Sequence, residues 1–156
     1  MKTVCLTMAT LIVAFAQTTA DGQFKVGADS VKLTKVYAYA TEGFFDKKKD
    51  DIVVVLTDRD VPESQIRDGF ALRRMASDGK LAYVQETLNT SGQIINFTLG
   101  HKGFKVAPSG GSTEHRFEGK LGTTVSGKVF TNGEQETFGS KYEYSATFSA
   151  PVHPKK

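Results

Sequence analysis

The chain has 156 residues, and 20 basic against 17 acidic side chains give it a formal net charge of only +3 at pH 7. A balance this close to neutral argues against nucleic acid as the main partner, because nucleic-acid binding needs a concentrated basic face. The single cysteine, Cys5, lies near the start, so the fold is expected to be stable without disulfides. The length suits one domain, since a chain of about 150 residues buries roughly 68–70% of its unfolded surface.

Residues 1–20 have the organisation of a secretory signal peptide. Lys2 precedes an apolar stretch from Val4 to Ala16, and small residues continue to Ala20. The stretch is too short for a transmembrane anchor, which needs about 20 apolar residues. Cleavage after Ala16 competes with cleavage after Ala20, and the second is favoured because it leaves a longer apolar region. We therefore expect a secreted or periplasmic protein with no stable membrane anchor.

The rest of the chain is expected to form a single, mainly β domain at residues 31–150. Residues 21–30 are polar and are interpreted as a flexible lead-in, and residues 151–156 as a polar tail. Between them, short runs of β-branched and aromatic residues are separated by Gly, Asn and Asp, a pattern typical of strands joined by turns. The seven expected strands are 31–40, 51–57, 80–88, 93–100, 113–121, 123–131 and 141–149.

The spacing of apolar residues predicts which side chains face the core. Residues 52–56 are apolar without alternation, which indicates a central strand covered on both sides. In the later strands apolar residues occupy every second position, as in an antiparallel sheet that faces water on one side. The side chains expected to point inward are Ala82, Val84, Leu88, Ile95, Phe97, Leu99, His115, Phe117, Leu121, Val125, Val129, Tyr142, Tyr144, Ala146 and Phe148.

Residues 60–78 interrupt the β pattern and are expected to be helical. Asp60 is predicted as the N-cap, with Glu63 three residues later completing a capping box. Phe70 belongs to a rough apolar stripe, and Gly79 is expected to end the helix in a left-handed conformation. An internal glycine weakens the segment by about 1 kcal/mol relative to Ala. The pattern predicts one short helix or two linked turns.

Together these elements predict a seven-stranded antiparallel β-sandwich, immunoglobulin-like in the loose architectural sense, with one short helical insertion. A small up-and-down β-barrel is the alternative, although the helical break after only two strands suits it less well. In either fold, the neighbouring residues Phe44 and Phe45 are expected to plug one end of the core.

No catalytic or cofactor motif is present in the sequence. It lacks a Gly-x-Ser-x-Gly nucleophile elbow, a phosphate-binding loop and the CxxC, HxH or HExxH spacings of metal sites. No catalytic residue, metal ligand or cofactor is therefore assigned. His115 is expected to be a core histidine with a backbone partner; a metal pair with His101 is the alternative.

The longest irregular stretch, residues 100–111, is the candidate binding surface. It carries His101, Lys102, Phe104 and Lys105, a mixture of cationic and aromatic side chains on a glycine-rich backbone. Such a loop suits an anionic partner. The sequence thus favours an exported, non-catalytic binding or interaction module for an unknown protein or small ligand. The alternatives are a carrier of small apolar ligands with an internal cavity, and a hydrolase or metalloenzyme with an unrecognised site.

Overall fold

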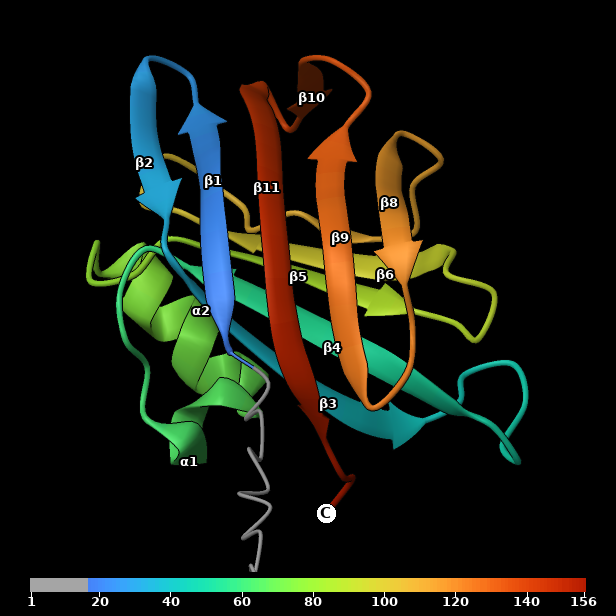
Figure 1. Cartoon of the computed structure of the whole chain (residues 1–156). Helices are drawn as coiled ribbons and strands as arrows, with labels where there is room; N and C mark the ends of the chain where they lie inside the picture. Colours follow the sequence, from blue (N-terminus) through green and yellow to red (C-terminus); the bar gives the residue numbers. More distant parts are fainter. Residues whose placement is uncertain (1–16) are drawn as a thin grey trace, which may run out of the picture.

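The computed structural model describes residues 17–156, so the predicted signal peptide lies outside the described residues except for positions 17–20. The described chain is mainly β, with one curled, open sheet and two short helices (Figure 1). The strands are β1 (Thr19–Val26), β2 (Asp29–Leu33), β3 (Lys35–Glu42), β4 (Asp50–Thr57), β5 (Tyr83–Leu88), β6 (Ile94–Gly100), β7 (Ser109–Gly110), β8 (His115–Lys120), β9 (Thr124–Thr131), β10 (Gln135–Thr137) and β11 (Ser140–His153). The helices are α1 (Glu63–Ile66) and α2 (Gly69–Ser77).

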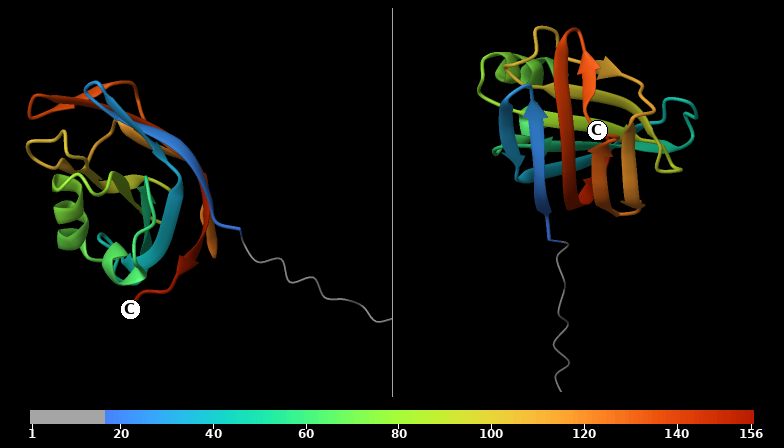
Figure 2. Two further views of the ribbon diagram at one scale, coloured as in Figure 1. Left: turned by 90° about the vertical axis from the view of Figure 1, so that its left-hand side faces the viewer. Right: turned by 90° about the horizontal axis from the view of Figure 1, so that it is seen from above.

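The sheet folds into two layers that cross one another (Figure 1). β2, β1, β11, β9 and β8 form the front layer, and β3, β4, β5 and β6 form the back layer. β11 joins the two, because it pairs with β1 and β9 and its end, at Val152 and His153, pairs in parallel with Ala38 and Tyr39 of β3. Figure 2 shows the resulting curl from the side.

The predicted mainly β class is therefore confirmed, but the seven-stranded sandwich is not. β11 is 14 residues long and belongs to both layers, so the layers are parts of one sheet. The sheet is open, with β2 and β7 at the ends of its main path. It is thus also not the closed barrel of the alternative prediction.

The predicted flexible lead-in, residues 21–30, is wrong. Most of it lies in β1 and the start of β2, and β1 pairs with β11 from Thr19 opposite Ser149 to Val26 opposite Tyr142. The alternation of this strand is weak because its first two inward positions, Ala20 and Gly22, are small and contrast little with the polar outer positions. The polar tail is shorter than predicted, since β11 continues to its end at residue 153. The predicted strand 31–40 is divided between β2 and β3, which lie in different layers.

The main core lies between the two layers and follows the predicted alternation closely. Ile95 is an exception, because the register between β5 and β6 shifts after Thr87 and pairs Leu88 with Ile94. Phe117 and Leu121 are half-buried at the edge of the core. The predicted inward residues that are fully or almost fully buried are Ala82, Val84, Leu88, Phe97, Leu99, His115, Val125, Val129, Tyr142, Tyr144, Ala146 and Phe148.

A second core lies between the helices and the outer face of the back layer. It includes Val53 and Val55 of β4 together with Leu72 of α2. Since Val54 and Leu56 of the same strand face the main core, β4 is covered on both sides, as its unbroken apolar run predicted.

The predicted helical insertion is present, but it consists of two short helices rather than one short helix or two linked turns, and its N-cap differs from the predicted one. Asp68 caps α2 by accepting hydrogen bonds from the backbone N–H groups of Phe70 and Ala71 at 3.0 and 3.1 Å. The predicted cap, Asp60, instead forms an ion pair with Lys35 at 3.3 Å. Phe70 is 84% exposed, because the first turn of α2 projects beyond the second core. None of the helices within residues 17–156 has the length and apolar character needed to cross a bilayer.

Candidate functional site

The four loop residues that were predicted to form one binding surface do not lie together on a common surface. His101 is buried, and the ring of Phe104 packs inward against Phe24 and Tyr142, with ring centroids 6.2 and 5.9 Å apart. The apolar surface of the Phe104 ring is therefore largely in contact with other residues of the protein.

The two lysines of this loop are exposed but lie at different hollows. Lys102 faces Asp29, with 3.6 Å between its Nζ and the nearer carboxylate oxygen. Lys105 lines a separate hollow that also contains Lys141 and Gly103. The loop thus presents two separate positive charges rather than one patch built around an aromatic ring.

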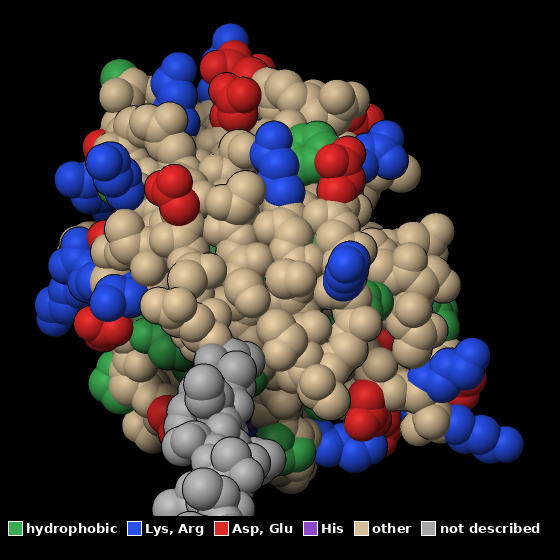
Figure 3. Space-filling model, in the orientation of Figure 1, with side chains coloured by type: hydrophobic (Ala, Val, Ile, Leu, Met, Phe, Trp, Pro, Cys, Tyr) green, Lys and Arg blue, Asp and Glu red, His purple; other side chains and the backbone are tan. Residues whose placement is uncertain are grey.

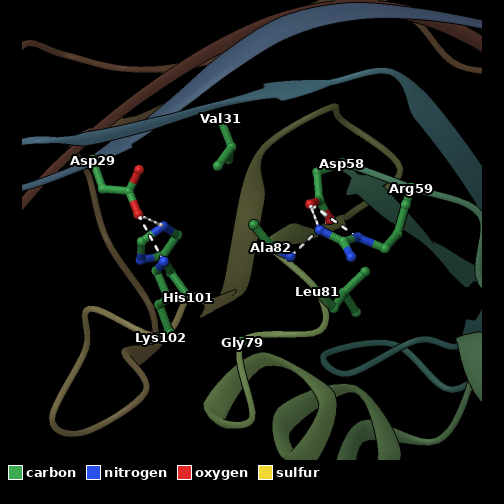
Figure 4. Close-up of a pocket in the computed structure, with 9 residues that line it drawn as sticks. All are labelled: Asp29, Val31, Asp58, Arg59, Gly79, Leu81, Ala82, His101 and Lys102. Carbon is green, nitrogen blue, oxygen red and sulfur yellow. Dashed lines mark hydrogen bonds and ion pairs between the residues drawn. The ribbon is translucent and has the colours of Figure 1, made fainter.

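A small polar pocket of about 140 Å³ contains His101 and Lys102 (Figure 4). On one side, Asp29 lies 3.4 Å from Nε2 of His101. On the other side, Asp58 accepts hydrogen bonds from Arg59 at 2.7 and 3.1 Å. Asp58 also accepts the N–H of Ala82 at 2.8 Å.

His101 has no free ring nitrogen with which to act as a base in this pocket. Its Nδ1 accepts the backbone N–H of Gly103 at 2.9 Å, so the proton of the neutral ring lies on Nε2 and points toward Asp29. Burial lowers the pKa of His101, and the nearby negative charge of Asp29 opposes that shift. Since both carboxylates in the pocket also face cations, its arrangement is that of a structural ion-pair cluster.

A second polar cluster is completely enclosed in the main core and connects the two layers. Glu86 of β5 comes from the back layer, whereas His115 of β8 and Tyr142 and Tyr144 of β11 come from the front layer. The carboxylate oxygen Oε1 of Glu86 lies 3.1 Å from Nδ1 of His115 and accepts a hydrogen bond from the hydroxyl of Tyr144. That hydroxyl oxygen is 2.9 Å from the same Nδ1. The other ring nitrogen of His115, Nε2, is 3.0 Å from the hydroxyl oxygen of Tyr142.

Burial dominates the electrostatics of this cluster. It raises the pKa of Glu86, although hydrogen bonds from His115 and Tyr144 favour the carboxylate. The pKa of Tyr144 lies well above its ordinary value, first because of burial and then because of the negative charge of Glu86. The side chains of Glu86 and His115 are inaccessible to solvent. In this conformation a substrate cannot reach them.

Sequence reasoning missed Glu86, although a signal for it was present. Glu86 shares the inward phase of β5 with Val84 and Leu88, and an acidic residue in such a position needs a buried partner. His115 was expected to bond to the backbone, but its ring nitrogens contact side chains instead. It is not paired with His101, which has its own partners in the polar pocket. In the described part of the chain, no place gathers three or more His, Cys, Asp or Glu side chains suited to hold a metal ion.

The third candidate is at the end of the molecule where the β3–β4 loop and the β5–β6 hairpin meet (Figure 1). Phe44 and Phe45 of that loop are 74% and 76% exposed, and their rings pack edge to face with centroids 5.0 Å apart. The prediction that they plug the core is wrong. The loop turns them outward, because the N–H of Phe44 donates to Asp51 at 2.8 Å. A Cβ atom at Gly43 would overlap the backbone on the far side of this loop.

Two open hollows flank these rings, one of about 490 Å³ beside Phe44 and one of about 470 Å³ beside Phe45. Ile95, placed by the register shift in β6, lines both. We call Phe44, Phe45 and the two hollows the aromatic end. Its neutral hydrogen-bonding side chains are Thr41, Thr87, Gln93, Asn96, Ser112 and Thr113, and its charged ones include Glu42, Asp51 and Arg116. His115 also lies at the wall of the hollow beside Phe45, although its side chain is inaccessible to solvent.

The front layer has a different surface. In Figure 3 most of this face is neither charged nor hydrophobic in colour; basic and acidic side chains are scattered over it and around its edge, and the hydrophobic patches are small. Comparison of the chain with known protein families, curated proteins and solved structures finds no match.

Proposed function

We propose that the protein is an exported, non-catalytic binding module whose contact surface is the aromatic end. The observation that carries the proposal is the outward position of Phe44 and Phe45 between two hollows. Apolar surface in water costs roughly 25 cal/mol per Å², and two adjacent Phe rings are large contributors. The loop holds them there through the hydrogen bond to Asp51 and the close packing at Gly43, so their exposure is built into the loop.

The proposed ligand is a neutral carbohydrate chain. Six amide and hydroxyl side chains line the aromatic end, and each can both donate and accept hydrogen bonds, as sugar hydroxyls require. The exposed rings supply flat apolar surfaces for the C–H faces of sugar rings. Because the hollows lie side by side along Ile95, an extended chain of several sugar units suits them better than a compact ligand.

The interior of the protein gives less support to the alternative functions. The rings of Phe24, Tyr144 and His115 pack edge to face, with centroids 6.4 Å apart for the first two and 5.4 Å for the last two. Such packing fills the space in which a carrier would hold an apolar ligand. Within residues 17–156, the histidine that has both carboxylate and hydroxyl partners is His115, and its side chain is enclosed. A hydrolase that used it would have to open its core to reach substrate. Export itself rests on the signal-peptide pattern of residues 1–20.

Binding to a panel of soluble polysaccharides, measured by affinity electrophoresis and calorimetry, tests the proposal. Replacing Phe44 and Phe45 together with Ala should weaken binding at least tenfold. Phe70→Ala is the matched control, because Phe70 is equally exposed but lies on α2, far from the aromatic end (Figure 1). Replacing Lys102 and Lys105 with Ala tests the surface predicted from sequence and should leave binding intact.

Three results would contradict the proposal. If no polysaccharide binds, or if binding survives the loss of both rings, the aromatic end is not a carbohydrate site. Loss of binding in the lysine variant alone would place the contact surface at the 100–111 loop and favour an anionic partner.

A further inference from the structure

The front layer ends in a strand with a free edge, which Figure 1 shows at the right of that layer. This strand, β8, pairs with β9 on one side and with no other strand in the described part of the chain. Its other side borders the open hollow beside Phe45, whose lining includes Arg116 and Phe117. A free edge presents unpaired backbone N–H and C=O groups, with which a strand from another molecule can pair.

The pairing of β8 with β9 determines which of its backbone groups point outward. The N–H of Asn132 donates to the C=O of Glu114 at 2.8 Å, immediately before β8 begins. In an antiparallel pair, such hydrogen-bonded positions alternate with positions whose N–H and C=O groups point away from the partner strand. The backbone groups at the free edge therefore belong to His115, Phe117 and Gly119.

The solvent face of this strand carries charges that alternate in sign. Because His115 is buried and Phe117 packs against the main core, the residues between and beside them point to the outer face. We call the four charged side chains on that face the edge charges. In chain order they are Glu114, Arg116, Glu118 and Lys120. Within residues 17–156, none of them forms an ion pair with its own chain.

A second copy of β8 complements the edge charges in one antiparallel register. Backbone groups that point outward must meet their counterparts, so the registers that overlap most of the strand are centred on Arg116, Phe117 or Glu118. Centring on Arg116 places Arg opposite Arg, and centring on Glu118 places Glu opposite Glu. Centring on Phe117 places Arg116 opposite Glu118 of the second copy. It also places Glu114 opposite Lys120, and two-fold symmetry forms each pair twice.

The same register brings apolar surface together on the inner face of the strand. It places Phe117 on the two-fold axis, next to Phe117 of the second copy. The ring packs against Phe148, with centroids 6.2 Å apart, but is only half-buried. An added strand would cover part of its remaining surface, which favours association.

We propose that two copies of the protein associate through their β8 strands, which pair antiparallel about Phe117 and join the two front layers into one sheet. Glu118, which is opposite Lys128 of its own β9, then has Arg116 of the second copy on its other side. Charged residues at a sheet edge usually prevent such pairing, but here each charge meets one of opposite sign.

The expected dimer is weak and concentration-dependent. Pairing through one six-residue strand forms a small contact compared with a standard interface, which buries about 1,600 Å². The proposal does not rest on the function assigned to the aromatic end. Since Arg116 also lines a hollow of that end, the test is carried out without polysaccharide.

Sedimentation velocity of the exported form, over a range of protein concentrations, measures the association. We expect a reversible equilibrium between monomer and dimer. Arg116→Glu and Glu118→Arg each place like charges opposite one another, so each should weaken association at least about tenfold. An equimolar mixture of the two variants places Glu opposite Arg at both positions. The mixture should therefore form a heterodimer about as readily as the unmodified protein forms its dimer.

Glu143→Arg is the matched control, because it makes the same change of charge at an exposed residue of β11, in the middle of the front layer. It should leave association unchanged, and circular dichroism shows whether each variant retains the fold. A protein that stays monomeric at every concentration overturns the proposal and leaves the edge to a strand of a different protein. Association that survives both single variants, or that the mixture of folded variants fails to restore, overturns it as well, because the contact is then not β8 in this register.

Discussion

The hydroxyl group of Tyr144 donates a hydrogen bond to the carboxylate of Glu86 across the main core. The two residues belong to β11 and β5, which lie in different layers and share no backbone hydrogen bonds. Their contact therefore fixes the position of one layer on the other with a directionality that apolar packing lacks.

Removing this hydroxyl should lower the stability of the protein. Tyr144→Phe leaves Glu86 and His115 with one partner fewer in an enclosed site, which is expected to lower the free energy of unfolding by about 1–3 kcal/mol. Tyr39→Phe is the control, because Tyr39 packs against Arg67 through its ring, which Phe retains; its effect should stay below about 0.5 kcal/mol. Urea unfolding of the two variants and of the unmodified protein measures both effects. Equal effects would show that the Tyr144–Glu86 contact contributes little.

Two phenylalanines that sequence reasoning misplaced provide a second test. Phe24 of β1 is fully buried, whereas Phe70 of α2 is exposed. Phe24→Ala should lower the free energy of unfolding by about 3–5 kcal/mol, as expected for a large cavity in a packed core. Phe70→Ala should change it by less than about 0.5 kcal/mol. A small effect at Phe24 would mean that β1 is not a stable part of the sheet.

The buried His101 should make the protein less stable in mildly acidic solution. Burial lowers its pKa in the folded state below the ordinary value of 6.5, so at lower pH the unfolded chain binds a proton that the folded chain does not. Stability is thus expected to fall as the pH decreases through and below that value. Asp29 and Asp58 moderate the effect, and the positive charge of Lys102 adds to it.

Comparison of Tm values at about pH 7.5 and pH 5.5 measures this dependence. In His101→Gln the fall in Tm over that range should be smaller than in the unmodified protein, since Gln can still accept the Gly103 N–H without titrating. His153→Gln removes an exposed imidazole and serves as the control. An unchanged pH dependence in His101→Gln would exclude His101 as its source.

The N-terminal boundary of β1 bears on where the exported chain begins. Thr19 pairs with Ser149, and Ala20 pairs with Phe148. A chain that starts at Asp21 loses these pairs, whereas one that starts at Gln17 keeps them. We expect the longer form to be more stable by about 0.5–1.5 kcal/mol, the net value of one hydrogen bond. Unfolding of the two forms in urea compares them, and the intact mass of the exported protein identifies the natural start. Equal stability would show that Thr19 and Ala20 contribute nothing to the sheet.

The longer strands from β5 onward, which are β5, β6, β8, β9 and β11, could be predicted because each has its own pattern of alternating residues; the short strands β7 and β10 were not predicted. Val125 and Val129, or Tyr142 and Tyr144, recur at every second position, and their burial follows from that pattern alone. β1 could not be found this way, since the residues that make it a strand lie in β11, more than a hundred positions away in the chain. Gly22 shows the same dependence, because it leaves room for Ala146.

The candidate sites were harder to predict for a related reason. The outward position of Phe44 results from its hydrogen bond to Asp51 and from the close packing at Gly43. Neither interaction can be read from the spacing of apolar residues along the sequence. The hydrogen-bond partners of Glu86 are set only by the folded protein, in which β8 and β11 place His115 and Tyr144 beside it. Alternation identifies the face on which a side chain lies, but the partner on that face comes from another layer.

The position of β11 also has a consequence for the order in which the protein folds. β1, β3, β9 and β10 all pair with this strand, and it follows all of them in the sequence. Until residues 140–153 are available, the front layer has no central strand, and β1 can pair only with β2. Contacts this distant along the chain slow folding, so the nascent protein remains incompletely folded until β11 has been synthesised.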